Sequence, residues 1–231
     1  MSSTGRRLRL APSLLSADFA DLVSAIHACE AGGAEALHLD VMDGHFVPNL
    51  SFGPALVAAV RARTNLPLDI HLMIDRPAKY AAAFARAGGS TLVFHVESSD
   101  EPAEVVRTIR SLGAEVGAAI KPGTEFRQVE PLLDRLDQVL VMSVEPGFSG
   151  QSFLPSALPK LRAARARLDS IGSDADVSID GGVTAETAVA AAREGATFFV
   201  CGNSVFAGGD VVENLRRLRA AVDGGAAGAV R

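Results

Sequence analysis

The sequence predicts a single-domain α/β fold, a TIM or (β/α)8 barrel, on three observations. An apolar run followed by an Ala/Arg/Glu-rich segment of helical periodicity recurs eight times along the chain. The 231 residues, 48% of them hydrophobic, suffice for one barrel of this kind with a full core. Histidines and aspartates stand where several apolar runs end, and barrels of this class carry their active sites at those strand ends.

The eight repeats define the expected elements in chain order. Each apolar run has the length of a buried strand and is bounded by turn-forming residues. Strands are therefore expected at residues 10–14, 36–40, 68–72, 91–96, 115–120, 138–143, 176–180 and 197–201. The intervening segments carry helix-forming residues at helical spacing and usually close with Gly. Helices are expected at residues 18–31, 54–62, 77–87, 101–111, 125–134, 156–170, 184–193 and 210–221.

The glycines distinguish the barrel from a doubly wound open sheet, which shows the same alternation. An open dinucleotide-binding sheet carries Gly-x-Gly-x-x-Gly after its first strand. Here the glycine-rich turns come late, after strands six, seven and eight, so the barrel is favoured. We expect the barrel to span residues 1–222, and the Gly/Ala-rich residues 223–231 to form a disordered tail.

Composition argues against several classes of protein. A net charge of −5 is unlike that of a general nucleic-acid or anionic-membrane surface. Cys29 and Cys201 do not form a Cys-x-x-Cys pair, so neither a disulfide framework nor a thiolate zinc site is expected. No apolar stretch has the length of a signal peptide or a transmembrane helix. We therefore expect a soluble, cytoplasmic protein that binds neither nucleic acid nor membrane.

Two histidines and two aspartates predict a metal site. His38 and Asp40 are two residues apart in the second strand, so alternation points both side chains to the same side. His71 lies at the end of the third strand and Asp180 ends the seventh. Because strand ends of a barrel meet at one mouth, the four residues can hold one divalent ion. Mixed imidazole and carboxylate ligands suit Zn²⁺ or Fe²⁺ first, and also Mn²⁺ or Co²⁺.

The glycine-rich turns predict a phosphate site at the same mouth. They contribute Gly147, Phe148, Ser149, Gly150, Gly181, Gly182, Gly202 and Asn203. Glycine lets backbone N–H groups approach an anion closely, and the helix starts behind these turns add partial positive charge. TIM barrels often bind phosphate at the loops after strands seven and eight. The alternative is that these are tight turns without a ligand.

Motifs spread over nearly the whole chain belong to one pattern. They are Ala11-Pro12-Ser13 with Ser16-Ala17-Asp18, residues 38–49, His71-Leu72-Met73, Lys121-Pro122-Gly123-Thr124, residues 142–148 and Asp180-Gly181-Gly182. With these motifs the chain resembles the ribulose-phosphate 3-epimerase family. The resemblance implies a TIM barrel that interconverts D-ribulose 5-phosphate and D-xylulose 5-phosphate in the pentose phosphate pathway. It also implies a phosphorylated ketose as substrate and a homo-oligomer, either a dimer or a hexamer.

The resemblance also implies a role for each site residue. The positions matching His38, Asp40, His71 and Asp180 hold the metal in that family, and those matching Asp40 and Asp180 form its acid/base pair. Ser13 and His71 match substrate contacts, and the glycine-rich turns match the phosphate grip. Inverting a carbon next to a ketone requires a proton to leave on one face and return on the other. Two carboxylates on opposite walls can do this through an enediolate, whose charge a divalent ion offsets.

Two departures from the family pattern lie at the phosphate end. The family commonly has Gly-Phe-Gly-Gly where this chain has Ser149 in third place, and Gly-Ser where it has Gly202-Asn203. They leave open an epimerase acting on a hexulose phosphate such as allulose 6-phosphate. A metal-dependent hydrolase and a non-catalytic sugar-phosphate-binding barrel are more remote alternatives. The hydrolase is disfavoured because the first strand ends in Ala11-Pro12-Ser13 and offers no His-x-His.

The remaining polar residues receive structural interpretations. His45 and His95 lie near strand ends and could line a pocket, but no direct chemical role is expected for either. Lys121 is expected to anchor a loop. The methionines at the mouth are expected to form an apolar floor beneath the sugar, and they are Met42, Met73 and Met142.

Overall fold

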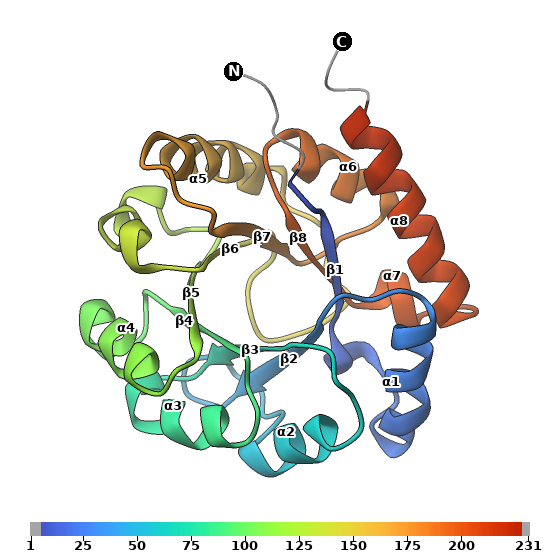
Figure 1. Ribbon diagram of the computed structural model, residues 1–231, viewed down its shortest axis with the longest axis horizontal. Coiled ribbons are helices and arrows are strands. Elements are labelled where there is room, and N and C mark those ends of the chain that lie inside the picture. The colour runs from blue at the N-terminus through green and yellow to red at the C-terminus, as the bar shows by residue number, and fades with distance from the viewer. Residues whose placement is uncertain (1–5, 228–231) are drawn as a thin grey trace.

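The computed structural model describes residues 6–227, in which eight parallel strands form a ring enclosed by helices (Figure 1). The strands are β1 Arg9–Pro12, β2 Leu37–Met42, β3 Leu68–Met73, β4 Thr91–His95, β5 Glu115–Ile120, β6 Gln138–Met142, β7 Asp176–Asp180 and β8 Phe198–Cys201. Their order is β1-β8-β7-β6-β5-β4-β3-β2. Just beyond β1, a parallel bridge from Ser13 to His38 joins the two ends of the sheet. The prediction of a TIM barrel is confirmed.

The helices cover the outer face of the ring (Figure 1). The α-helices are α1 Leu22–Ala31, α2 Pro54–Arg61, α3 Pro77–Arg86, α4 Pro102–Ser111, α5 Leu158–Ser170, α6 Ala185–Arg193, α7 Asn203–Phe206 and α8 Val211–Ala227. Short 3-10 helices are η1 Leu14–Ser16, η2 Phe19–Asp21, η3 Phe126–Gln128, η4 Glu130–Arg135 and η5 Pro155–Ala157. Proline begins α2, α3 and α4, where its fixed φ suits a helix and its missing N–H is not needed. Nowhere in residues 6–227 is a helix both long and apolar enough to cross a membrane.

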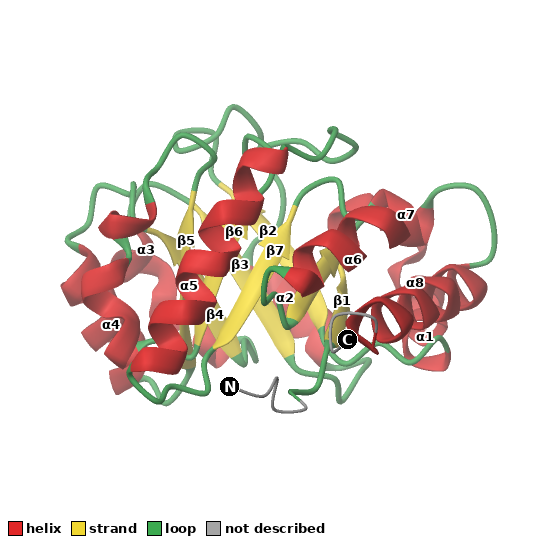
Figure 2. Ribbon diagram, turned by 90° about the horizontal axis from the view of Figure 1, so that it is seen from above, coloured by secondary structure: helices red, strands yellow, loops and turns green. Residues whose placement is uncertain are grey.

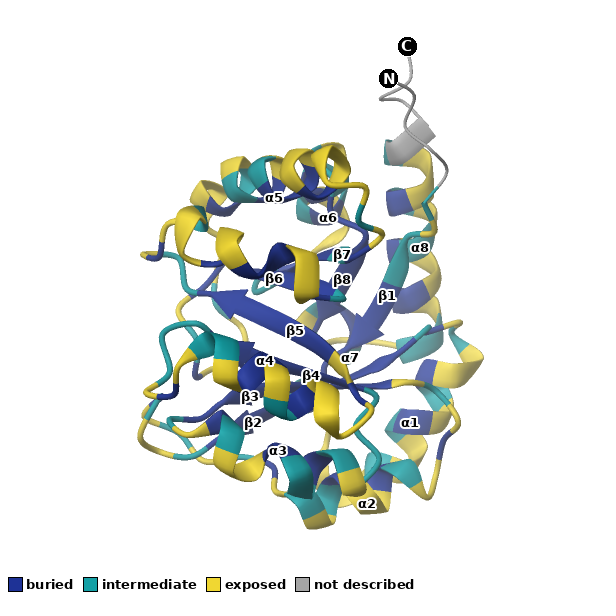
Figure 3. Ribbon diagram, turned by 60° about the vertical axis from the view of Figure 1, so that its left-hand side comes forward, coloured by how far each residue is buried: buried dark blue, intermediate teal, exposed yellow. Residues whose placement is uncertain are grey.

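The core has two layers because strand side chains alternate between the faces of the ring. In β2, Leu39 and Val41 belong to the apolar layer between strands and helices. Inside the ring, smaller clusters form around residues such as Val93 and Leu140. Figure 3 shows the strands buried over most of their length, while the helices expose their outer faces. Polar residues at inward-facing strand positions are therefore held by a rigid apolar frame.

Strand register brings the candidate residues to one end of the barrel. Along β2 and β3, His38 pairs with Asp69 and Asp40 pairs with His71. On the other side of the ring, Asp180 of β7 lies beside β6 and β8. Long loops leave the strands at this mouth (Figure 2). The C-terminal ends of β2, β3 and β7 thus converge on one site.

Several expected helices differ in the structure, and two of the differences have a clear physical cause. The expected helix at residues 125–134 is replaced by η3 and η4, because Pro131 lacks the N–H that a continuous α-helix needs. Helix α8 continues to Ala227, so residues 223–227, expected in the tail, are helical. Gly225 packs closely on α6, where a Cβ atom would lie 2.6 Å from Val189. The other expected tail residues, 228–231, lie outside the described residues.

Candidate active site

Four side chains that the sequence singled out meet inside the barrel mouth. Candidate ligand atoms of His38, Asp40, His71 and Asp180 all lie within 4.8 Å of one another. Asp40 Oδ1 lies 3.3 Å from His38 Nε2 and 3.1 Å from His71 Nδ1, and Asp180 Oδ2 lies 3.7 Å from His71 Nδ1. Two imidazoles and two carboxylates at this range are a donor set suited to a divalent transition-metal ion. This group could therefore bind a metal.

The two carboxylates of the cluster have opposite electrostatic environments. Burial disfavours the charge of Asp40, but the adjacent His38 and His71 outweigh burial and hold the pKa of Asp40 well below its ordinary value. Burial, followed by the charge of Asp40, raises the pKa of Asp180 to about 6. The pair therefore combines a carboxylate that stays ionised with one that retains a proton more readily, a pattern typical of acid/base chemistry.

On the side away from the cluster, both histidines contact residues that the sequence did not predict as part of the site. His38 Nδ1 lies 2.7 Å from Asp69 Oδ2. His71 Nε2 lies 2.9 Å from His95 Nε2, and His95 Nδ1 lies 3.1 Å from Glu97 Oε2. One signal was available in the sequence: Asp69 stands two residues before His71 in an apolar strand and shares its inward face. His95 lies within the site, although it was expected only to line a pocket.

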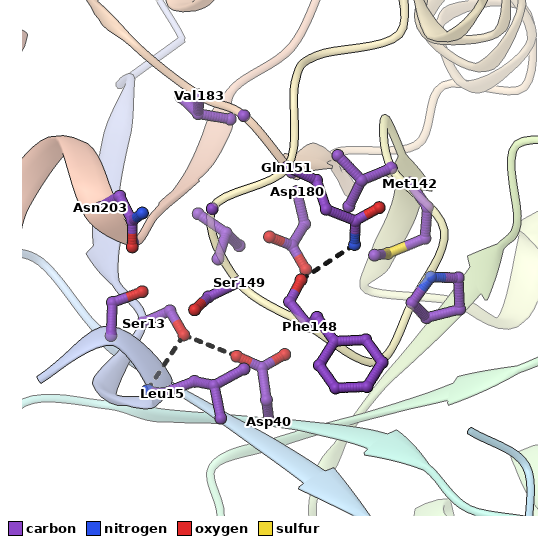
Figure 4. Close-up of a pocket in the computed structure, with 18 of the residues that line it drawn as sticks. Ser13, Leu15, Asp40, Met142, Phe148, Ser149, Gln151, Asp180, Val183 and Asn203 are labelled. Carbon is purple, nitrogen blue, oxygen red and sulfur yellow. Dashed lines mark hydrogen bonds between the residues drawn. The ribbon is translucent and has the colours of Figure 1, made fainter. Parts of the chain in front are cut away.

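A cavity of about 430 Å³ opens above the cluster. Among its lining residues are Ser13, Asp40, Met42, Met73, Met142, Gly147, Phe148, Ser149, Gly150, Asp180, Gly181, Gly182, Gly202 and Asn203. Figure 4 shows Ser13, Asp40, Ser149 and Asp180 around its centre, with Ser13 Oγ donating to Asp40 Oδ2 at 2.6 Å. His71 is fully buried and does not line the cavity. All the other residues expected to contact substrate surround one space.

The far end of the cavity is formed by the glycine-rich turns. At Gly182, φ is +60° and a Cβ atom would lie 2.8 Å from Phe153 Cα, so the turn after β7 fits closely against the loop after β6. A Cβ atom on Gly150 would lie 2.8 Å from Asn203 Nδ2, so Asn203 lies against the same turn that carries Ser149. The hydroxyls of Ser16 and Ser204 are buried here and find no hydrogen-bond partner among the described residues. Their free donors had not been predicted.

Comparisons with known proteins match both the fold and the sequence. A mutant tryptophan synthase alpha-subunit from Pyrococcus furiosus has a similar fold, with a TM-score of 0.68 at 17% identity over 95% of this chain and 99% of that chain. A relative from Bacillus subtilis (strain 168), named ribulose-phosphate 3-epimerase, is 43% identical over 213 residues, which cover 92% of this chain and 98% of the relative. A relative of the same name from Mycobacterium bovis is 46% identical over 217 residues, 94% of this chain and 93% of the relative.

The family comparison covers the barrel itself. The sequence model of the ribulose-phosphate 3 epimerase family matches residues 9–206, from β1 into α7. The matched range includes the His/Asp cluster and every turn that lines the far end of the cavity. The chain therefore belongs to the ribulose-phosphate 3 epimerase family.

Proposed function

We propose that this protein interconverts D-ribulose 5-phosphate and D-xylulose 5-phosphate. The observation that carries the proposal is the pair Asp40 and Asp180, which line one cavity from different strands and have pKa values shifted in opposite directions. The names of the relatives support the same reaction. Epimerisation at carbon 3 needs a proton acceptor on one face of the sugar and a proton donor on the other.

Asp40 and Asp180 are the two groups that move protons. The ionised carboxylate accepts the proton from carbon 3 on its own face, and the protonated carboxylate returns one to the opposite face. In the reverse reaction the roles exchange, so each direction leaves the enzyme ready for the other. Ser13, whose hydroxyl donates to Asp40 Oδ2 at 2.6 Å, fixes that carboxylate in orientation.

The cluster of His38, Asp40, His71 and Asp180 is the proposed metal site. A divalent ion held there would offset the negative charge that develops on the enediolate oxygens. The ligand types favour Zn²⁺ or Fe²⁺, with Mn²⁺ and Co²⁺ also compatible. Metal analysis of the purified protein, compared with chelator-treated protein, identifies the ion.

The glycine-rich end of the cavity is the proposed phosphate site. Gly182 allows close backbone approach, and the buried hydroxyls of Ser16 and Ser204 offer donors that are otherwise without partners among the described residues. Charge-assisted hydrogen bonds to phosphate oxygens would satisfy these donors. Ser149 and Asn203 add a hydroxyl and an amide donor at the same end and leave the His/Asp cluster undisturbed. We therefore favour the five-carbon substrate over a hexulose phosphate.

A coupled assay on metal-stripped and reconstituted enzyme tests this function. We expect turnover of ribulose 5-phosphate only after reconstitution, with kcat/KM above that for allulose 6-phosphate. A preference of tenfold or more for the hexulose phosphate, about 1.4 kcal/mol, would make it the assigned substrate and leave the proposed mechanism unchanged. Absence of epimerisation with either sugar would overturn the proposal and favour a binding barrel.

A further inference from the structure

We infer that two arms of side chains behind the cluster determine which nitrogen each histidine offers to a metal. Asp69 makes His38 offer Nε2, whereas Glu97, acting through His95, makes His71 offer Nδ1. The inference deepens the proposed metal site and rests on it. Asp69, His95 and Glu97 are positioning residues, since each acts through a histidine.

The first arm contains a single carboxylate. Asp69 Oδ2 lies 2.7 Å from His38 Nδ1, while His38 Nε2 faces Asp40 Oδ1 at 3.3 Å. A carboxylate only accepts hydrogen bonds, so the proton of a neutral His38 ring stays on Nδ1. The lone pair of Nε2 is then directed at the cluster. Because Asp69 and His38 are register partners on β3 and β2, the rigid barrel fixes this geometry.

The second arm contains two residues and selects the other nitrogen. His71 Nδ1 faces Asp40 and Asp180, and its Nε2 lies 2.9 Å from His95 Nε2. One of those two nitrogens has to donate and the other accept. Glu97 Oε2, 3.1 Å from His95 Nδ1, accepts the proton of that nitrogen. A neutral His95 therefore accepts at Nε2, His71 donates from Nε2, and His71 Nδ1 is left free for the metal.

Glu97, at the outer end of the second arm, is held in place by the loop that follows β5. The backbone N–H of Lys121, which follows β5, donates to Glu97 Oε1 at 2.8 Å. Lys160 Nζ donates in turn to the carbonyls of Lys121 at 3.1 Å and of Pro122 and Thr124 at 2.6 Å. Glu97 therefore accepts from two directions and holds a fixed orientation. The arm links a proposed ligand on β3 to the loops after β4 and β5.

Metal affinity tests both arms without reference to turnover. Partners that orient metal-bound histidines typically contribute a factor of about 10–100 to affinity. We expect Asp69→Asn and Glu97→Gln each to weaken Co²⁺ binding by roughly that factor, because an amide can also donate and so permits the wrong tautomer. Matched controls are Glu115→Gln, whose carboxylate accepts from Thr91, and Asp100→Asn, whose carboxylate accepts from Arg76 and Ala78. These controls should bind Co²⁺ as the parent does.

Histidine nitrogen NMR tests the inference on the parent protein and needs no variant. The chain has five histidines, so long-range proton–nitrogen spectra of the Zn²⁺-loaded protein can be assigned. We expect ligation through Nε2 in His38 and through Nδ1 in His71. Ligation of either ring through the other nitrogen would overturn the inference, as would unchanged Co²⁺ affinity in both Asp69→Asn and Glu97→Gln.

Turnover separates this inference from the proposed function. At saturating Co²⁺ the positioning variants should recover most of the parental kcat, which a lost proton-transfer group would not do. A parent that binds Zn²⁺ through the expected nitrogens but does not epimerise either sugar phosphate would overturn the function and leave the inference standing. A parent that epimerises the sugar phosphate but binds Zn²⁺ through His38 Nδ1 and His71 Nε2 would overturn the inference and leave the function standing. A parent that binds no divalent ion would overturn the inference.

Discussion

At the scale of single residues, His71 provides the most direct test of the metal site. Replacing it with Ala removes one imidazole from a cluster whose ligand atoms lie within 4.8 Å of one another. We expect His71→Ala to lower metal content and turnover together, since an ion held by this cluster would offset the negative charge that develops during the reaction. Elemental analysis and the coupled assay measure the two effects. The exposed His45 supplies the control, and His45→Ala should change neither.

The proton-transfer pair is tested separately by Asp180→Asn. An amide cannot take up or return a proton, so we expect the fold to persist and epimerisation to fall by a factor of about 100 or more. Asp40 can still remove the carbon 3 proton from one epimer, so that epimer should exchange this proton with solvent deuterium without forming the other. Mass spectrometry of the recovered sugar measures exchange. Equal epimerisation rates in variant and parent would exclude the two-base assignment.

The site could be predicted from the sequence only where a residue's own strand reveals its direction. His38 and Asp40 were found because they alternate on one strand, and Asp180 because it ends a strand before two glycines. Asp69 contacts His38, which lies on a neighbouring strand. Glu97 contacts His95, and only His95 contacts His71. The register between neighbouring strands is set by packing around the whole ring. The spacing of residues within one strand therefore does not reveal it.

At the scale of elements, the turn after β7 depends on glycine. A Cβ atom on Gly182 would lie 2.8 Å from Phe153 Cα, and φ is +60°. We expect Gly182→Ala to displace the loop after β6, raise KM for the sugar phosphate several-fold and lower stability by about 1–3 kcal/mol. Gly172 is the control: its φ is +68° with nothing within 4 Å of a Cβ atom, so Gly172→Ala should lower stability with KM unchanged. Equal KM values in the two variants would contradict this role.

Element boundaries were least predictable where helical composition competes with one interrupting residue or with distant packing. Residues 125–134 have a helical composition, yet they form η3 and η4, because Pro131 in the first turn of η4 lacks the N–H that a continuous α-helix needs. In the opposite direction, the Gly/Ala-rich end of α8 continues as helix beside α6, with Gly225 close to Val189. Composition underestimated this segment because its stabilising contacts come from a helix that lies earlier in the chain.

At the scale of the whole molecule, the buried thiols predict a loss of stability in alkali. Burial, and then the charge of Glu30, raises the pKa of Cys29 from 9.0 to about 12. Between those values the unfolded chain releases a proton that the folded chain retains, so stability falls as pH rises. One such thiol should cost about 1.4 kcal/mol between pH 8 and pH 10. Urea unfolding at both pH values measures this, and Cys29→Ala should reduce the decrease by that amount. A Cys29→Ala variant whose stability falls as much as the parent's between these pH values would contradict this prediction.

Metal binding should also stabilise the whole barrel. The proposed ligands come from β2, β3 and β7, and the site gathers the carboxylates of Asp40 and Asp180, whose mutual repulsion a bound cation relieves. An ion that binds only the folded chain contributes about 2.7 kcal/mol at one hundred times its dissociation constant. For a domain of this size each kcal/mol moves Tm by roughly 2–4 °C, so loading should raise Tm by roughly 5–11 °C.

Calorimetry of chelator-treated protein, with and without added Co²⁺, measures this difference. Asp180→Asn is the informative variant, because it removes one carboxylate from the cluster and should reduce the increase. Glu115→Gln should keep the parental increase, since Glu115 hydrogen-bonds to Thr91 at the N-terminal ends of β4 and β5. An equal rise in Tm for parent and Asp180→Asn would place the stabilising ion elsewhere in the protein. The same rise in parent and Glu115→Gln, with a smaller one in Asp180→Asn, would assign the stabilisation to the ligands at the barrel mouth.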